Sequence, residues 1–323
     1  MQSRVLTNDF SWSKSRHEKL RECARAYYLH YYASWQGWER NAPPATRELY
    51  ILKKLGNRFT WVGSVVHDAI RDVLTDVRFG RVIDEAALTE RVYQRMRTDF
   101  RSSMRKAYWT EKSRRGFTGL VEHEYAEPIP DSDWKAGWET VRAAIQWFLS
   151  SRWLPLARAL KPAQWLEVDE SFETANFNLD GVRVFAIPDF AYVDEDGSPV
   201  VVDWKTGQAR EGYDEQVLGY ALYIAQRYGF PVERVKTALV YLNDGKEIEV
   251  RVDASAEARF RQHFQDSVAS MRALLENPQG NQPKASAEFA MTQDLNKCAH
   301  CVFRRPCGRA AQVEPARLES VAA

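Results

Sequence analysis

The chain has 323 residues, of which 45% are hydrophobic and 28% charged, enough for one elaborate domain or two simple ones. A net charge of +1 argues against a protein that is basic throughout, so any affinity for nucleic acid would have to come from local patches. No apolar run approaches the roughly 18 residues of a membrane span. The N-terminal stretch also lacks the apolar core of an export signal, so we expect a cytoplasmic protein.

Helical spacing dominates the first half of the chain. Apolar residues recur every three or four positions in four segments, which predicts a helix in each. The predicted helices span residues 13–33, 60–78, 84–107 and 131–160. Cys23 lies in the first of them, directly before the aromatic stretch ARAYYLHYYASW.

A local excess of positive charge begins in the third predicted helix. Residues 91–116 hold nine Lys or Arg against two acidic residues. Arg97, Arg101 and Arg105 recur every four positions, so they share a helix face that could offer guanidinium groups to the phosphates of DNA. A face that is merely solvated is the alternative. The apolar stripe beside the arginines consists of Tyr93, Met96, Phe100 and Met104.

Polar and apolar residues alternate from residue 163 onward, which is typical of strands. Asp-Gly pairs at 180–181 and 196–197 indicate hairpin turns, and we expect three strands before residue 206. The remaining predicted elements are a helix over 213–228, strands over 234–242 and 246–252, and a helix over 254–276. The stretch ENPQGNQPKAS that follows is expected to be a linker.

Two acids and a lysine are predicted to meet at the end of the strand PVVVDWK. Side chains alternate along a strand, so Asp203 and Lys205 share a face. The turn DEDGSP brings Asp189, on the preceding hairpin strand, back alongside them. Such a group suits a divalent cation between the acids, with the lysine facing an anionic substrate or a nucleophilic water. An Asp-Lys pair at an exposed edge strand is the alternative.

Two helices contribute further polar residues. On the helix over 60–78, His67 lies one turn after Gly63, at the edge of the apolar stripe. A hydrogen-bonded core histidine is the alternative. On the helix over 213–228, Gln216 and Tyr220 are four residues apart and project from one side.

The order of these motifs resembles the PD-(D/E)XK nucleases, and within them the RecB-like branch. That branch has a helix with a histidine, then an Asp, then (D/E)-x-K on a strand, then Q-x-x-x-Y on a helix. The resemblance implies that His67, Asp189, Asp203 and the main-chain carbonyl of Trp204 hold one or two Mg²⁺ or Mn²⁺ ions. These ions would polarise the scissile phosphate and lower the pKa of a bound water.

The same resemblance assigns roles to the remaining motif residues. Lys205 would orient the water or stabilise charge developing on the phosphate oxygens. Gln216 and Tyr220 would position Lys205 or the strand backbone. For Tyr220, a plain core position is an equal alternative.

The four cysteines form a second pattern, with Cys23 alone and Cys298, Cys301 and Cys307 in CAHCVFRRPC. Disulfides are not expected without an export signal, and four thiolates suit either a [4Fe-4S] cluster or tetrahedral zinc. The pattern resembles AddB-type and CRISPR-adaptation nucleases, in which such a cluster joins the two ends of the chain. His300 is expected to take no part. The tail has little apolar surface, so metal ligation is expected to hold it in place.

Together these resemblances imply an α/β fold of the restriction-endonuclease type, a mixed central sheet flanked by helices with a large helical N-terminal part. The chain would be one nuclease domain over 1–323. Its expected parts are N-terminal helices (1–80), a helical insertion (81–162), the catalytic sheet (163–276), and a linker with the cysteines (277–323).

The implied function is that of a metal-dependent DNA nuclease, expected to be an exonuclease acting on DNA with a single-stranded region. The resemblance leaves recombination or repair, phage replication and CRISPR-type adaptation open as settings. The chain has no phosphate-binding loop motif, so unwinding would come from a helicase partner; a recombinase or integrase partner is also compatible. A catalytically silent or partner-dependent DNA-binding subunit with the same cluster is the alternative.

Overall fold

The computed structural model describes residues 6–111, 117–168, 175–207 and 213–313. Helices fill the first half, as predicted, although residues 131–160 form two helices rather than one. Two of the longer helices begin at side-chain caps: Asn57 accepts a hydrogen bond from the Thr60 N–H, and Asp84 accepts one from that of Ala87. The elements are β1 (Ser11–Trp12), α1 (Lys14–Glu22), α2 (Ala24–Tyr28), a π-helical turn (Leu29–Ala33), α3 (Pro44–Leu52), α4 (Arg58–Arg78), α5 (Glu85–Met104), a 3₁₀ turn (Ala107–Trp109), α6 (Val121–Glu124), α7 (Asp131–Ser150), α8 (Trp153–Ala159) and a 3₁₀ turn (Pro162–Gln164).

The first predicted helix is not continuous, which corrects the expectation for residues 13–33. Cys23 has an extended backbone, with φ −166° and ψ 115°, and it separates α1 from α2. Periodicity missed this break because the apolar spacing runs on across it. The break turns the chain at the cysteine itself.

The second half contains the sheets. Between residues 163 and 206 there are five strands rather than the three predicted, because β3 and β4 form a separate small sheet in which β4 also pairs with β1. The elements are β2 (Trp165–Val168), β3 (Asn176–Leu179), β4 (Val182–Phe185), β5 (Phe190–Val193), β6 (Pro199–Lys205), α9 (Tyr213–Tyr228), a 3₁₀ turn (Val232–Arg234), β7 (Lys236–Tyr241), β8 (Glu247–Ile248), α10 (Ala254–Arg272), β9 (Leu275–Asn277), β10 (Gln282–Pro283), a 3₁₀ turn (Ser286–Glu288) and α11 (Leu295–Ala299).

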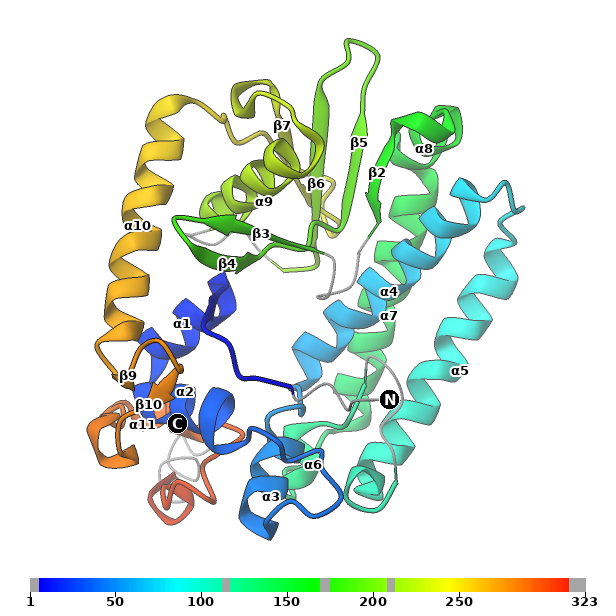
Figure 1. Cartoon of the computed structure of the whole chain (residues 1–323). Helices are drawn as coiled ribbons and strands as arrows, with labels where there is room; N and C mark the ends of the chain where they lie inside the picture. Colours follow the sequence, from blue (N-terminus) through cyan, green and yellow to red (C-terminus); the bar gives the residue numbers. More distant parts are fainter. Residues whose placement is uncertain (1–5, 112–116, 169–174, 208–212, 314–323) are drawn as a thin grey trace, which may run out of the picture.

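The main sheet has the strand order β2-β5-β6-β7-β8 and is mixed (Figure 1). Strands β6 and β7 are parallel, whereas the other neighbours are antiparallel. The parallel pair is joined by α9, as a crossover requires. The smaller sheet has the order β1-β4-β3, with β1 parallel to β4. This mixed sheet flanked by helices confirms the expected α/β architecture.

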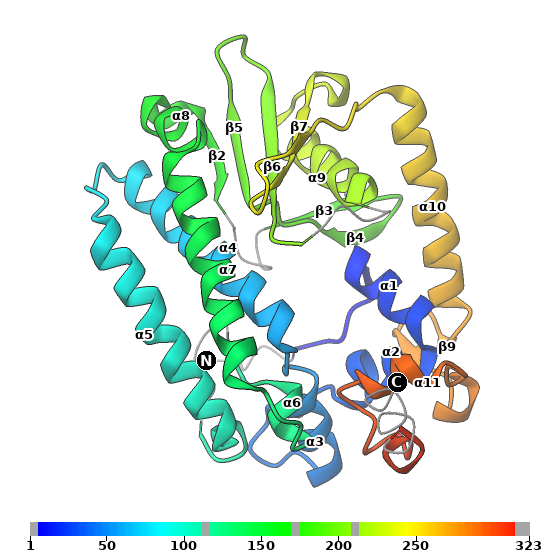
Figure 2. The same cartoon turned by 180° about the vertical axis from the view of Figure 1, so that it is seen from behind.

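Helices cover both faces of the main sheet, and β6 shows how its residues divide between them. Val201 packs in the core that contains α9 and α10, whereas Val202 and Trp204 pack in the core that contains α4, α7 and α8. Figures 1 and 2 show α4, α5 and α7 side by side along one side of the molecule and α10 along the other. The alternation predicted for the strand PVVVDWK is therefore confirmed.

The segment expected to be a linker forms a short antiparallel hairpin of β9 and β10 instead. Asn281, at the hairpin turn, is buried; its side chain accepts a hydrogen bond from Tyr32 Oη and donates one to the Asn8 carbonyl. The polar residues that suggested a linker instead form the turn of this hairpin and make these hydrogen bonds. The hairpin thus attaches the C-terminal part to the N-terminal part.

Among the described residues, no helix is long and apolar enough to cross a membrane.

Candidate functional site

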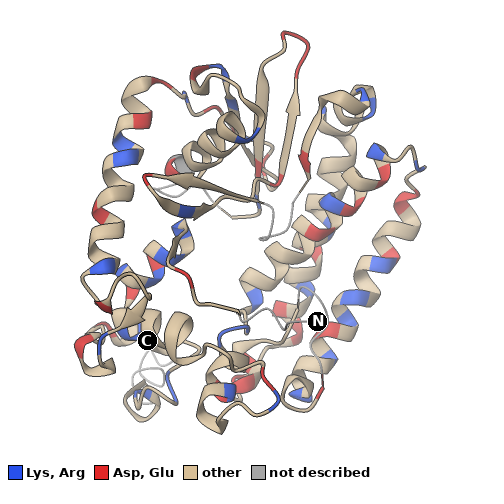
Figure 3. Ribbon diagram, viewed as in Figure 1, with Lys and Arg blue, Asp and Glu red and all other residues tan. Residues whose placement is uncertain are grey.

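The two acids of the predicted site lie at neighbouring strand ends. Asp189 directly precedes β5, and because Phe190 pairs with Val202, it lies beside Asp203 near the end of β6. Its Oδ2 accepts a hydrogen bond of 2.8 Å from the Trp204 main-chain N–H. The strand pairing therefore brings together two carboxylates 14 positions apart in the sequence, and Figure 3 shows acidic residues at these strand ends.

His67 reaches this point from α4. Its Nδ1 lies 3.0 Å from Asp189 Oδ1. Burial lowers the pKa of His67, but the charge of Asp189 and the hydrogen bond to it outweigh burial and hold the pKa at about 9. The imidazole is therefore protonated at neutral pH and donates to Asp189. A cation bound here would have to displace that proton.

Asp203 is the most buried member, with 2% of its surface exposed. Burial and the negative charge of Asp189 raise its pKa to about 6, although Lys205, whose Nζ lies 2.5 Å from Asp203 Oδ2, acts in the opposite direction. A carboxylate that is buried beside a second carboxylate favours a positive charge next to it. The site is therefore electrostatically suited to a cation.

A chain of hydrogen bonds holds Lys205. Its Nζ donates to Gln216 Oε1 at 3.0 Å, and Gln216 Nε2 donates to Tyr220 Oη at 2.5 Å. Both partners lie on α9, so the predicted helix places its two polar residues where the lysine ends. Tyr220 is also buried in the core beneath α9, with 8% of its surface exposed.

Trp204 separates the two charged residues of β6. Its indole points to the other face of the sheet, where it packs edge-on against Phe148 and Trp153 with ring centroids 5.5 and 5.3 Å away. This anchor fixes the strand end. The side chain of Trp204 thus stabilises the fold, whereas its main chain lies next to Asp189 and Asp203.

The donor chemistry of these residues fits a divalent cation, since two carboxylates, an imidazole and a main-chain carbonyl are suitable oxygen and nitrogen ligands. Within the described part of the chain, no three or more His, Cys, Asp or Glu residues form a group that could hold a metal ion as they stand. The carboxylates are instead engaged by His67, Lys205 and a main-chain N–H.

The basic face of α5 is only partly as predicted (Figure 3). Arg101 and Arg105 are exposed, whereas Arg97 is half-buried, with its guanidinium 5.6 Å from the Tyr93 ring centroid. Met104 is 60% exposed and does not belong to the buried apolar stripe, because it is the last residue of α5. The rest of the basic stretch, 112–116, lies outside the described residues.

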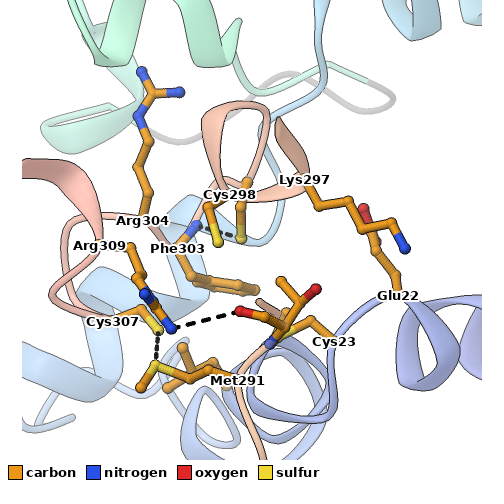
Figure 4. A pocket seen from close by; sticks show the side chains of 13 residues that line it. Glu22, Cys23, Met291, Lys297, Cys298, Phe303, Arg304, Cys307 and Arg309 are labelled. Carbon is orange, nitrogen blue, oxygen red and sulfur yellow. Dashed lines mark hydrogen bonds between the residues drawn. The ribbon is translucent and has the colours of Figure 1, made fainter. Parts of the chain in front are cut away.

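The four cysteines line one pocket, although almost the whole chain separates the first from the others. Figure 4 shows Cys23, Cys298 and Cys307 around a common space, with Met291 beside Cys307. Cys23 occupies the break between α1 and α2, and Cys298 lies on α11. His300 is exposed.

Main-chain groups point at the sulfurs of this cysteine pocket. The N–H of Thr292 donates to Cys23 Sγ, and that of Phe303 donates to Cys301 Sγ, both at 3.4 Å. Burial raises the pKa of Cys301 to about 11. Four thiols with N–H donors around them fit a metal or cluster chemically, and binding would release their protons.

The expectation that little apolar surface holds the tail is wrong. Phe289 and Phe303 are fully buried, the first against the aromatic residues of α2 and the second among residues of α3. They were overlooked because the tail as a whole is rich in polar and charged residues. The burial of these two rings therefore attaches the tail to the N-terminal helices, which the polar composition of the tail did not indicate.

Charged residues also hold the tail, and sequence reasoning missed them. Arg305 pairs with the buried Glu124 at 2.7 Å and with Glu48 at 3.0 Å, and Arg304 pairs with Glu127. The arginines stand inside the cysteine motif, as CVFRRPC, but their acidic partners are too distant in sequence to be recognised. The cysteine segment is therefore attached to the helical part independently of any metal.

Comparison with known proteins supports the assignment made from these residues. The family model of the PD-(D/E)XK nuclease superfamily matches residues 11–308, a region that contains His67, Asp189, Asp203, Lys205 and Gln216. No curated protein is significantly similar to the chain. Among solved structures, one titled "Crystal structure of SSO0001" is 14% identical, with a TM-score of 0.24 over 57% of this chain and 89% of that one. The chain belongs to the PD-(D/E)XK nuclease superfamily.

Proposed function

We propose that this protein is a metal-dependent DNA nuclease of the RecB-like branch, acting as an exonuclease on DNA with a single-stranded region. One observation carries the proposal: Lys205 ends the central strand with its ammonium held between Asp203 and Gln216, while Asp189 and His67 converge on the same strand end. A structural ion pair needs neither the second acid nor the histidine.

The residues of this site divide the work of phosphodiester hydrolysis. A Mg²⁺ or Mn²⁺ ion held by Asp189, Asp203, His67 and the Trp204 carbonyl would polarise the phosphate and acidify a water. Lys205 orients the water or stabilises charge on the phosphate oxygens. Gln216 fixes the lysine in one position, which lowers the cost of ordering it at the moment of reaction.

We also propose that the cysteine pocket holds a [4Fe-4S] cluster, with zinc as the alternative. Four cysteines around one pocket and N–H donors to two of the sulfurs support this. A helicase, recombinase or integrase partner is proposed on the resemblance alone.

A comparison of DNA cleavage by the Lys205→Ala variant and by the unaltered protein tests the proposed nuclease function directly. Anaerobically purified protein is incubated with end-labelled single-stranded and duplex DNA, with Mg²⁺, with Mn²⁺ or with a chelator. Lys205→Ala should lower cleavage at least about 100-fold, as removal of a positioned charge-stabilising donor does. The chelator should abolish cleavage by the unaltered protein.

The matched control is Lys236→Ala, on the neighbouring strand β7. Lys236 lies beside Val200 at the opposite end of the strand pair, where it contacts Asp194 and Asp196. This variant should cleave normally. Full activity in a folded Lys205→Ala protein would contradict the mechanism, and absence of cleavage in every variant would favour the catalytically silent alternative.

A further inference from the structure

A second pocket opens next to the proposed catalytic strand end. It lies between the N-terminal turns of α4 and α7 and the residues Thr206 and Gly207, which follow β6, and its cavity volume is about 400 Å³. Ligand pockets in proteins typically measure roughly 300–1,000 Å³. The space is therefore large enough for a nucleotide-sized group.

Aromatic rings form the floor of this pocket. Trp61 and Trp134 lie nearly parallel, with ring centroids 5.7 Å apart and an interplanar angle of 29°, and Phe100 meets Trp134 at 5.0 Å. Trp61 is buried and belongs to the core, but Trp134 is only half-buried and lines the space. Trp134 thus presents part of its side chain to the pocket.

Phe59 stands at the rim with 71% of its surface exposed. The guanidinium of Arg58 lies 4.7 Å from its ring centroid, and an ion pair of 3.0 Å with Asp133 on α7 holds that guanidinium. A large aromatic side chain exposed beside a pocket contributes little to the fold. It is, however, suited to cover a flat ligand from the second side.

The pocket lies close to the end of β6, where the proposed catalytic lysine stands. Thr206 and Gly207 line it and directly follow Lys205, so Gly207 Cα is at most roughly 7 Å from Lys205 Cα. Gly63, one turn before His67 on α4, lets this helix lie close to Thr206. A Cβ atom at residue 63 would lie only 3.2 Å from Thr206 Oγ1. A group bound in the pocket thus lies next to the strand end that carries Lys205.

We propose that this aromatic pocket takes one unpaired nucleobase of the DNA strand whose phosphodiester lies at Lys205, an inference that rests on the proposed nuclease function. Stacking on aromatic side chains is how proteins bind single strands without reading sequence. A paired base is stacked inside its duplex and cannot enter. The pocket therefore selects single-stranded DNA, and because most of its lining is apolar, it accepts any base.

The test measures binding in the Lys205→Ala background, so that no cleavage occurs. The probes are a short fluorescein-labelled oligothymidylate and a blunt duplex of equal length, followed by fluorescence anisotropy. Adding Phe59→Ala should weaken binding of the oligothymidylate roughly tenfold, because one stacking partner is lost. Adding Phe59→Tyr should preserve binding, since the ring remains.

Phe79→Ala is the matched control, because Phe79 is 67% exposed at the other end of the same helix α4. It should leave both affinities unchanged, and Phe59→Ala should leave the affinity for the duplex unchanged. Unaltered oligothymidylate binding by Phe59→Ala, or an equal loss with the duplex or with Phe79→Ala, would overturn the inference. A protein without nuclease activity refutes the proposed function instead, since the binding comparison does not depend on cleavage.

Discussion

At the scale of single residues, Asp203 is a carboxylate that the fold holds in an unfavourable place. Burial and the charge of Asp189 raise its pKa to about 6, above the ordinary value of 3.8. The carboxyl group of Asp203 therefore binds a proton more tightly in the folded protein than in the unfolded chain. The free energy of unfolding consequently falls as the pH rises from about 4 to about 6, and it stays lower above that range.

Replacement of Asp203 by Asn should therefore stabilise the metal-free protein. At about pH 7.5, in a chelator, we expect Asp203→Asn to raise the free energy of unfolding by about 1–3 kcal/mol, because the repulsion from Asp189 and the burial of charge are both removed. At about pH 4 the gain should shrink towards zero. Denaturant unfolding at the two pH values measures the difference.

Asp196→Asn provides a control of opposite sign. Hydrogen bonds from Lys236 and from Ser198 lower the pKa of the exposed Asp196, so the charged form is the favoured one there. This variant should not gain stability at neutral pH. A loss of stability in Asp203→Asn at about pH 7.5 would show that the attraction of Lys205 outweighs burial.

At the scale of elements, the residues of the catalytic motifs were predictable because each depends on local pattern. Period-two alternation placed Asp203 and Lys205 on one strand face, and helical spacing placed Gln216 and Tyr220 on one side of α9. The hairpin turns predicted at the Asp-Gly pairs 180–181 and 196–197 are confirmed by the β3–β4 and β5–β6 pairs. The division into five strands was not predicted, because alternation does not show where one short strand ends and the next begins.

Other features of the site could not be predicted because they depend on distant parts of the chain. The break at Cys23 is stabilised by contacts with the segment near Thr292. The pocket beside Phe59 combines α4, α7 and the loop after β6, which no local pattern relates. Aromatic residues spaced along two helices predict a core equally well.

The arginines of α5 provide a prediction at this scale. Replacing Arg97, Arg101 and Arg105 together with Gln should weaken DNA binding and flatten its dependence on salt concentration. Each lost contact with a phosphate of single-stranded DNA should lower the slope by about 0.7. Because Arg97 is partly packed on Tyr93, we expect the slope of the salt dependence to change by less than the loss of three phosphate contacts would give.

A second triple variant on the opposite side of the molecule removes the same charge. Arg251, Arg259 and Arg272 lie on or next to α10, and all are exposed. Their replacement with Gln should leave the salt dependence unchanged. If both triple variants give the same slope, α5 presents only a solvated face.

At the scale of the whole molecule, two different forces join the ends of the chain. The buried Phe289 and Phe303 and the ion pairs of Arg305 attach the tail by packing and charge. The cysteine pocket would add metal ligation to this attachment. The two contributions are separable because they use different side chains.

Cys23→Ala should therefore remove the cluster without releasing the tail. We expect anaerobically purified protein to be brown and to contain iron, and Cys23→Ala to be colourless, with only a modest rise in protease cleavage after residue 289, because Phe289 and Phe303 remain buried. Iron analysis and limited proteolysis measure the two effects.

His300→Ala is the control, since this exposed residue lies inside the cysteine motif and should not affect the colour. A colourless protein that contains zinc would replace the iron-sulfur assignment with the zinc alternative. Full release of the tail in Cys23→Ala would show that ligation dominates the attachment.

The separation of Cys23 from its partners has a consequence for biosynthesis. Cys23 is translated 275 residues before Cys298, the next cysteine, a delay on the order of tens of seconds at ordinary rates of translation. Every residue of the proposed catalytic site is made within that interval. The nascent chain can therefore assemble its sheet before the last three cysteines are made, and insertion of the proposed cluster would be a late step of maturation.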